Sequence, residues 1–397
     1  MTDVDVYVAS KIAGRLVKAG AKHVFSYHQD AFEAVSLTMP LRTESYVFQG
    51  GLHPVFQMNL PEGQLRQAIE RATAKQYGSD DLTVLALLGS SQIGRMAYTL
   101  VDQSITEQAD SLPDLQTLLG SDDATLFNQL LTRFATHSGV AGAQPKVLLD
   151  IVKSKASLIT QSYIVKSWGD EYPELGCNEY ACLTLAKQAG LNVPDTYLSD
   201  NGKLLISKRF DLNETGEPLG FEDFCVLQGK STREKYDASL ESCANTIRHY
   251  VSPIYQQQAL YDFFKLTLVN VLVKNGDAHL KNSGVVYDDL RQFQPGQSPE
   301  TERQLAPIFD IVSTVPYLPN DIMALSLTGS KRWPKWKVLQ QFARQHCGLN
   351  SQTINLAVDE VQQASTLTLP LLNDLADQHP EFLPIAEIMG TLLQQPI

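Results

Sequence analysis

The sequence lacks the long apolar runs that a membrane-spanning protein requires. The longest candidate, residues 266–273, contains Thr267 and Asn270 and falls far short of the roughly 18 residues that a membrane span needs. The first residues are acidic where a secretory signal is basic. The five cysteines are odd in number and form no CxxC pair, so their spacing indicates neither a disulfide framework nor a zinc site. We therefore expect a cytoplasmic protein that does not contact a membrane.

Positive charge is also scarce. Thirty-two basic residues face 44 acidic ones, which gives a net charge of −12 over 397 residues. Such a balance argues against a protein that coats nucleic acid or an anionic membrane over its whole surface. One dense basic and aromatic run exists at residues 331–337. It could hold phosphates and stack bases, but we favour a helix start with two partly buried tryptophans.

Two other catalytic signatures are missing. The histidines form no H-x-x-x-H pair of the kind that holds a catalytic zinc, and no G-x-S-x-G nucleophile turn occurs. The composition is that of a globular protein, with 43% hydrophobic and 19% charged residues.

The hydrophobic pattern predicts an α+β protein with a mostly helical C-terminal half. We expect an N-terminal α/β module over residues 1–107, a connector over 108–130, an α+β lobe over 131–211 and a helical lobe over 212–397. The predicted strands cover residues 4–8, 12–17, 147–151, 162–165 and 204–207. The predicted helices cover residues 64–75, 180–189, 260–274, 338–345 and 354–375. Residues 285–306 are expected to form a hairpin with a long polar loop. An α+β lobe followed by a helical lobe is the plan of a protein kinase.

The most informative segment is residues 275–282, directly after the predicted buried helix. Phosphoryl transfer needs a carboxylate that orients the attacking hydroxyl and oxygen ligands for Mg²⁺. Asp277 and Asn282, five residues apart, match these two needs, and Asp310 follows the predicted hairpin as a second metal ligand. A lone D-x-x-x-x-N also occurs by chance. Asp277 could instead cap a helix, and His279 could be a partly buried histidine with satisfied hydrogen bonds.

Two upstream features strengthen this interpretation. Lys166 ends an apolar strand, and Glu179 immediately precedes the predicted helix 180–189, where it could hold such a lysine in place, as the strand lysine and helix glutamate do in kinases. An exposed lysine–glutamate pair of little energetic value is the alternative. Residues 139–146 are rich in small side chains, which let backbone N–H groups approach phosphates, but an ordinary turn would have the same composition.

Taken together and in order, several segments resemble the HipA family of serine/threonine kinases, the toxins of bacterial toxin–antitoxin pairs. The resemblance covers nearly the whole chain and rests on residues 6–16, 36–42, 59–63, 141–146, 163–166, 178–194, 208–211, 222–229, 275–282 and 306–314. It implies a two-lobed protein-kinase-like fold, ATP and Mg²⁺ as cofactors, and a catalytic Asp277 with Asn282 and Asp310 at the metal. The implied ATP-binding residues are Ala141, Gly142, Ala143, Gln144, Pro145, Lys146, Lys166, Lys208, Arg209, Phe210, His279, Leu280, Lys281, Asn282, Phe309 and Asp310.

The sequence departs from the family in one regulatory position. Family members often carry a serine, just before the phosphate loop, whose autophosphorylation inactivates the kinase. Here the aligned residue is Gly139, and Ser138 lies one position earlier as the remaining candidate for autophosphorylation.

The resemblance also implies partners. These are a protein substrate such as an aminoacyl-tRNA synthetase, whose phosphorylation would stop translation and growth, and a small helix-turn-helix antitoxin like HipB, expected as a homodimer, that recruits the toxin to operator DNA. Two alternatives stay open: a lipid or small-molecule phosphotransferase, and a nucleotide-binding co-repressor without kinase activity.

Overall fold

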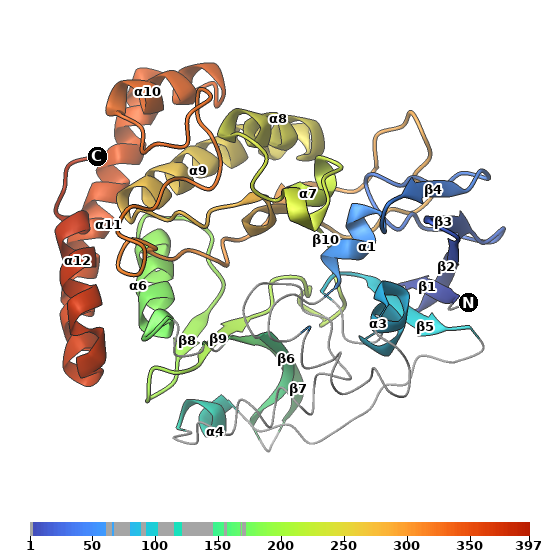
Figure 1. Ribbon diagram of the computed structural model, residues 1–397, viewed down its shortest axis with the longest axis horizontal. Helices are drawn as coiled ribbons and strands as arrows, with labels where there is room; N and C mark the ends of the chain where they lie inside the picture. Colours follow the sequence, from blue (N-terminus) through green and yellow to red (C-terminus); the bar gives the residue numbers. More distant parts are fainter. Residues whose placement is uncertain are drawn as a thin grey trace. The chain divides into compact units, whose positions relative to one another are not determined.

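The protein is described by a computed structural model (Figure 1). It describes residues 3–60, 66, 80–88, 93–101, 115–120, 146–154, 157–166, 168 and 172–397. The chain forms two compact units, which are considered separately. The first unit comprises Met1–Ser167, Arg209–Thr232 and Val286–Glu302, and the second comprises Trp168–Lys208, Arg233–Val285 and Arg303–Ile397.

An antiparallel five-stranded sheet forms the N-terminal part of the first unit. Its strands are β1 (Val4–Val8), β2 (Lys11–Ala19), β3 (Lys22–Tyr27), β4 (Tyr46–Gln49) and β5 (Met96–Leu100), in the order β4-β3-β2-β1-β5. Helices α1 (Pro54–Met58) and α3 (Asp81–Leu88) accompany the sheet. Phe25, Phe56 and Tyr98 are fully buried, and their rings contact one another in sequence. The strands predicted at 4–8 and 12–17 are confirmed, whereas the helix predicted at 64–75 lies outside the described residues except for residue 66, which is helical.

The remainder of the first unit includes a second hairpin. β6 (Lys146–Ser154) pairs antiparallel with β7 (Ser157–Lys166), which confirms the two strands predicted there. α4 (Leu115–Leu119), β10 (Gly220–Asp223) and α7 (Phe224–Leu227) also belong to this unit. The Asp223 carboxylate accepts a hydrogen bond from the Val226 N–H and so caps α7. The chain passes from the second unit to the first within β11 (Gly284–Tyr287).

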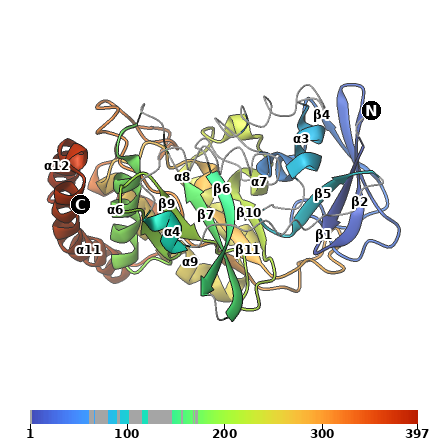
Figure 2. The ribbon, with the colours of Figure 1, turned by 90° about the horizontal axis from the view of Figure 1, so that it is seen from below.

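Helices dominate the second unit. They are α6 (Leu175–Gln188), α8 (Leu240–Tyr250), α9 (Pro253–Leu272), α10 (Trp336–Gln345), α11 (Ser351–Gln378) and α12 (Leu383–Leu393), with short strands β8 (Thr196–Leu198), β9 (Leu205–Lys208) and β12 (Arg303–Leu305). α11 packs against α6, α9 and α12; its neighbours α6 and α12 can be followed in both Figure 1 and Figure 2. The Ala306 N–H donates to the Gly284 carbonyl beside β11, which agrees with the predicted hairpin.

The predicted buried helix is confirmed as α9, although it begins at Pro253, seven residues earlier than expected. Proline is favoured in the first helical turn because the missing N–H would have no partner there. The residues between the two starts are mostly polar (Tyr255, Gln256, Gln257 and Gln258), so they do not continue the apolar pattern from which the start was predicted. Within the described residues, no helix combines the length and the apolar character that a bilayer crossing would require.

Candidate active site

The predicted catalytic segment is a tightly bonded loop at the end of α9. The Asn275 N–H donates to the Asn270 carbonyl at 2.8 Å, and the Asn275 side chain accepts from the Asp277 N–H at 3.0 Å. The Asp277 carbonyl in turn accepts from the His279 N–H at 2.8 Å. A single 3₁₀ turn, Leu280–Asn282, follows, and its N-cap is His279. Among the described helices, the one that begins next to Asp277 is therefore capped by His279 and not by this aspartate, which argues against the alternative explanation of Asp277 as a helix cap.

The Asp277 carboxylate is half exposed and has a phenol beside it. Its side chain is 43% exposed, and its Oδ1 accepts a hydrogen bond from the Tyr236 hydroxyl at 2.6 Å. The His279 Nε2 lies 4.0 Å from the same oxygen, with the Tyr236 and His279 rings edge to face. The carboxylate is thus open to solvent yet already engaged with a hydroxyl, which is the interaction expected of a group that orients a hydroxyl.

Asn282 has the properties of a metal ligand. Its Nδ2 donates to the Asp277 carbonyl at 3.3 Å, which fixes the amide next to the catalytic segment. Its Oδ1 is buried and has no hydrogen-bond partner among the described residues. A buried acceptor without a partner is costly unless a ligand satisfies it, and an amide oxygen is a donor that Mg²⁺ accepts. The residues present therefore fit a divalent cation.

Asp310 belongs to a segment, residues 308–314, that hydrogen bonds attach to the loop of residues 274–282. The Thr314 Oγ1 accepts from the Gly276 N–H and donates to the Lys274 carbonyl, each at 3.0 Å. Upstream, the Ile308 N–H donates to the Asn192 carbonyl at 2.8 Å. Asp310 lies between these two anchors, so the segment that carries it is held at both ends.

Helix α6 is attached to the same segment by Asn178. The buried Asn178 amide donates to the Ser313 carbonyl at 2.9 Å and accepts from the Ser313 N–H at 2.8 Å. Asn178 immediately precedes Glu179, which is fully buried on α6. The contacts made by Tyr236, Asn178 and Thr314 were not predicted. Only tertiary structure brings these side chains to the site, although Asn178 and Thr314 lie inside the segments that carry the family resemblance.

Gly276 is required by close packing. A Cβ at this position would lie 1.9 Å from the Asp321 Oδ2 and 2.8 Å from the Ile322 carbonyl oxygen. Real Cβ atoms do not approach other atoms so closely, so any side chain at Gly276 would displace the residue next to Asp277.

The other predicted site residues fall in four groups. Lys166 is buried at the end of β7 in the first unit, while Glu179 lies in the second, and their pairing remains a prediction. In the predicted adenine hinge, the Lys208 N–H donates to the Asp195 carbonyl, Arg209 forms an ion pair with Asp211, and Phe210 packs edge-on against Phe221.

Leu280 is buried, Lys281 and Phe309 are half-buried, and Lys146 begins β6. Ser138, Gly139 and the loop residues Ala141, Gly142, Ala143, Gln144 and Pro145 lie outside the described residues.

The tryptophans of the basic and aromatic run at residues 331–337 are half-buried. The Trp333 Nε1 donates to the Asp321 carbonyl at 2.9 Å, and the Lys274 ammonium lies 4.9 Å from the centre of a Trp333 ring. Trp336 is the first residue of α10. These contacts support the structural interpretation of the run as a helix start.

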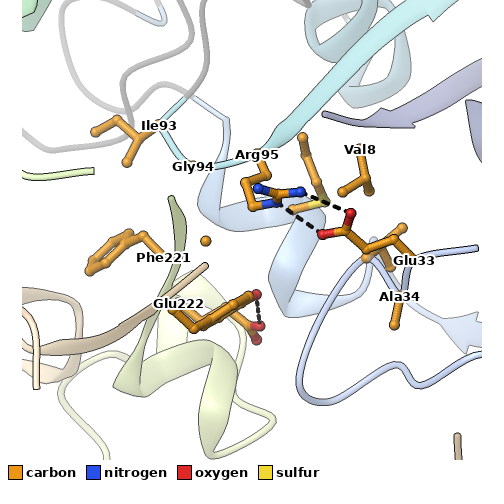
Figure 3. A pocket seen from close by; sticks show the side chains of 12 residues that line it. Val8, Glu33, Ala34, Ile93, Gly94, Arg95, Phe221 and Glu222 are labelled. Atoms are coloured by element: carbon orange, nitrogen blue, oxygen red, sulfur yellow. Dashed lines mark hydrogen bonds and ion pairs between the residues drawn. The ribbon is translucent and has the colours of Figure 1, made fainter. Parts of the chain in front are cut away.

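A narrow pocket in the first unit contains none of the predicted site residues (Figure 3). Arg95 points at Glu33 across it, with the Arg95 Nη2 2.8 Å from the Glu33 Oε2. Glu222 lies on its wall and accepts hydrogen bonds from the Ser36 hydroxyl, the Leu37 N–H and the Tyr287 hydroxyl, each at 2.7 Å. Burial raises the pKa of Glu222 to about 7 despite these three donors.

Comparison with known protein families identifies the family to which the chain belongs. The model of the HipA-like C-terminal domain matches residues 138–368, and the model of the HipA N-terminal domain matches residues 4–99. The chain belongs to the HipA family. This confirms the resemblance found in the sequence, because the two matched regions together cover most of the chain.

Individual HipA-family relatives are distant. Two proteins of Sinorhizobium fredii (strain NGR234) that carry provisional kinase names, Y4dM and Y4mE, are 27% and 28% identical to this chain over 302 and 308 residues. These matches cover 70% and 71% of this chain but only 66% and 69% of the relatives. The structure of HipA from Shewanella oneidensis MR-1, solved with HipB and operator DNA, is 19% identical and superposes with a TM-score of 0.67 over 98% of this chain and 96% of that one. The likeness confirms the predicted α+β, two-lobed kinase-like fold of this HipA-family protein.

Proposed function

We propose that this HipA-family protein is an ATP-dependent serine/threonine protein kinase that acts as the toxin of a HipA/HipB-like toxin–antitoxin system. One observation carries the proposal. The loop that presents the half-exposed Asp277 carboxylate also holds the Asn282 amide, whose buried oxygen has no partner among the described residues. Phosphoryl transfer requires at least a carboxylate that orients the attacking hydroxyl and a ligand for the metal ion, and this loop offers both.

Each residue has a proposed role in the reaction. Asp277 orients the attacking hydroxyl and accepts its proton. Asn282 and Asp310 would hold Mg²⁺, which neutralises charge on the nucleotide phosphates when bound. Lys166 and His279 would contribute positive or polar contacts to the phosphates, with Glu179 holding Lys166. Lys208, Arg209 and Phe210 would meet adenine, and residues 141–146 would cover the phosphates.

The proposed partners follow from the family. The protein substrate would be an aminoacyl-tRNA synthetase, so that phosphorylation stops translation in the cytoplasm. A helix-turn-helix antitoxin would restrain the kinase and bring it to operator DNA, by analogy with the Shewanella complex, in which HipA is assembled with HipB and its operator DNA. The net charge of −12 suits a basic, DNA-binding partner better than direct binding of DNA.

The test compares the wild type with Asp277→Ala, using radiolabelled ATP and a cell lysate as the source of substrates. We expect the substitution to lower phosphate transfer to protein at least about a hundredfold, because it removes the positioned general base. It should also relieve growth arrest on expression. Asp200→Ala, at an exposed aspartate, is the matched control and should keep full activity.

Three outcomes would contradict the proposal. They are undiminished transfer by Asp277→Ala, transfer only to lipid vesicles or aminoglycosides, and the absence of any transfer from a wild-type protein that still binds ATP. The last result would favour the co-repressor alternative.

A further inference from the structure

Three side chains of the kinds that bind metal ions meet in the second unit, apart from the residues of the proposed active site. Glu174 immediately precedes α6, Cys177 lies in the first turn of that helix, and His379 follows α11. Each offers one ligand atom, and these atoms all lie within 4.8 Å of one another. The cysteine and the histidine are 202 residues apart in the chain, so no sequence spacing could indicate the cluster.

The distances suit a small tetrahedral ion. The Cys177 Sγ lies 3.5 Å from the Glu174 Oε2. Zinc bonds of about 2.3 Å to sulfur and 2.0 Å to a carboxylate oxygen, at a tetrahedral angle, place these two ligand atoms about 3.5 Å apart. No pair of the three ligand atoms is more than 4.8 Å apart, which exceeds such an edge by little more than about 1 Å, a difference that side-chain rotation can close.

The imidazole of His379 provides an independent indication. His379 is only 8% exposed, and its ring makes no hydrogen bond or ion pair with any residue that the structure describes. The ring nitrogens of this largely buried imidazole are therefore available to a ligand, and a neutral imidazole nitrogen is a common zinc ligand.

Gly202 leaves room between two of the ligand atoms. A Cβ at Gly202 would lie 3.0 Å from the His379 Nδ1 and 3.1 Å from the Cys177 Sγ. Both atoms therefore face the same small space, which stays open because residue 202 has no side chain.

We propose that Glu174, Cys177 and His379 form a binding site for a zinc ion, with the fourth coordination position left to water. A thiolate, an imidazole and a carboxylate form a mixed donor set that suits Zn²⁺ and is too soft for Mg²⁺ or Ca²⁺. The thiol of Cys177 has to lose its proton on binding, and burial together with Glu174 raises its pKa. Zinc binding therefore releases a proton and weakens as the pH falls.

The ion would join the start of α6 to the end of α11. α6 also carries Asn178, whose side chain holds Ser313 of the Asp310 segment. Zinc should accordingly stabilise this part of the fold, whether or not the protein transfers phosphate.

The experiment titrates the purified, EDTA-treated full chain with Zn²⁺ against a chromophoric chelator, and with Co²⁺ to detect thiolate-to-metal absorption. We expect one zinc ion per chain, a thiolate–Co²⁺ band, and a rise in the unfolding temperature on adding zinc. Cys177→Ala and His379→Ala should each weaken binding at least about a hundredfold, since loss of a direct ligand costs no less than loss of a supporting residue. Both substitutions should abolish the rise in unfolding temperature that zinc causes in the wild type.

Cys347→Ala, at a buried cysteine outside the cluster, is the matched control and should bind as the wild type does. Cys177→Ser provides a second variant of nearly the same size in case Cys177→Ala does not fold. The proposal is overturned if the wild type binds no stoichiometric zinc, or if a folded Cys177 variant binds zinc as tightly as the wild type.

Discussion

The hydrogen bond from Tyr236 to Asp277 gives a specific prediction. The Tyr236 hydroxyl lies 2.6 Å from the Asp277 Oδ1, where a substrate hydroxyl would have to lie if Asp277 orients it as we propose. The bond must break before a substrate or water can be oriented. A hydrogen bond to a charged group contributes about 1.5–3 kcal/mol, and less when the pair is partly exposed as here. Tyr236→Phe should therefore raise the slow hydrolysis of Mg-ATP several-fold by freeing the carboxylate for water.

Release of ADP from wild type and Tyr236→Phe measures this effect. Tyr172→Phe serves as the control, because Tyr172 is also an exposed tyrosine and its ring contacts Tyr317 rather than the catalytic loop. A fall in the rate of hydrolysis with unchanged ATP affinity would instead show that Tyr236 holds Asp277 in its working position.

At the scale of elements, the Asn178 side chain attaches α6 to the segment that carries Asp310, through two hydrogen bonds to the Ser313 backbone. Asn178→Ala would leave the buried N–H and carbonyl of Ser313 without their side-chain partner, at a cost of about 1–3 kcal/mol for each group. We expect a free energy of unfolding lower by about 3 kcal/mol and weaker binding of Mg-ATP.

Thermal unfolding and ATP titration of the same protein samples measure both effects. Asn245→Ala is the control, because Asn245 is exposed on α8 and its side chain accepts a hydrogen bond from the neighbouring Arg248 side chain. If Asn178→Ala binds Mg-ATP like the wild type, α6 does not position the proposed metal-binding segment.

Two glycines form a matched pair for a second test. Alanine at Gly276 would press its Cβ against Asp321 and the Ile322 carbonyl, so the catalytic loop must shift. We expect Gly276→Ala to lower the unfolding temperature and to reduce phosphate transfer more than tenfold. Gly390 lies inside α12, where a Cβ would meet only Leu369, at 3.9 Å. Gly390→Ala should stabilise the protein by up to about 1 kcal/mol through helix propensity, with unchanged activity. Equal effects of the two substitutions would contradict this account of the loop.

At the scale of the whole molecule, the sequence predicts best what local pattern determines. Alternating apolar residues and apolar runs predicted β1, β2, β6, β7 and α9. They could do so because an element with a buried face needs apolar residues at a regular spacing in the sequence. Helix starts were less accurate: α6 begins at Leu175 rather than 180, since its first turn depends on tertiary contacts such as that of Asn178. Spacing could single out Asp277 and Asn282 as candidate site residues, because they lie on one loop. It could not identify Tyr236, or the cluster of Cys177 and His379, because distant segments bring these side chains together.

The N-terminal module and the later segments of the first unit share a buried titratable group, Glu222. It accepts hydrogen bonds from Ser36 and Leu37 in the module and from Tyr287 at the end of β11, while the neighbouring Asp223 opposes its ionisation. The pKa of Glu222 is about 7 in the folded protein and about 4.5 in its ordinary state. A folded pKa above the unfolded one gives stability that is fully present below about pH 4.5 and is lost as the pH rises through about 7.

Glu222→Gln removes this titration. Relative to the variant, the wild type should lose about 2–3 kcal/mol of unfolding free energy between pH 5 and pH 8, because a shift of one pKa unit corresponds to about 1.4 kcal/mol. Urea unfolding of both proteins at pH 5 and pH 8 measures their difference in unfolding free energy at each pH. Any effect of the amide that does not depend on pH cancels when the two differences are compared. Glu214→Gln, at an exposed glutamate of the same unit, should show no such change. A wild-type-minus-variant difference that stays constant with pH would mean that Glu222 remains ionised throughout this range and that its three donors outweigh its burial.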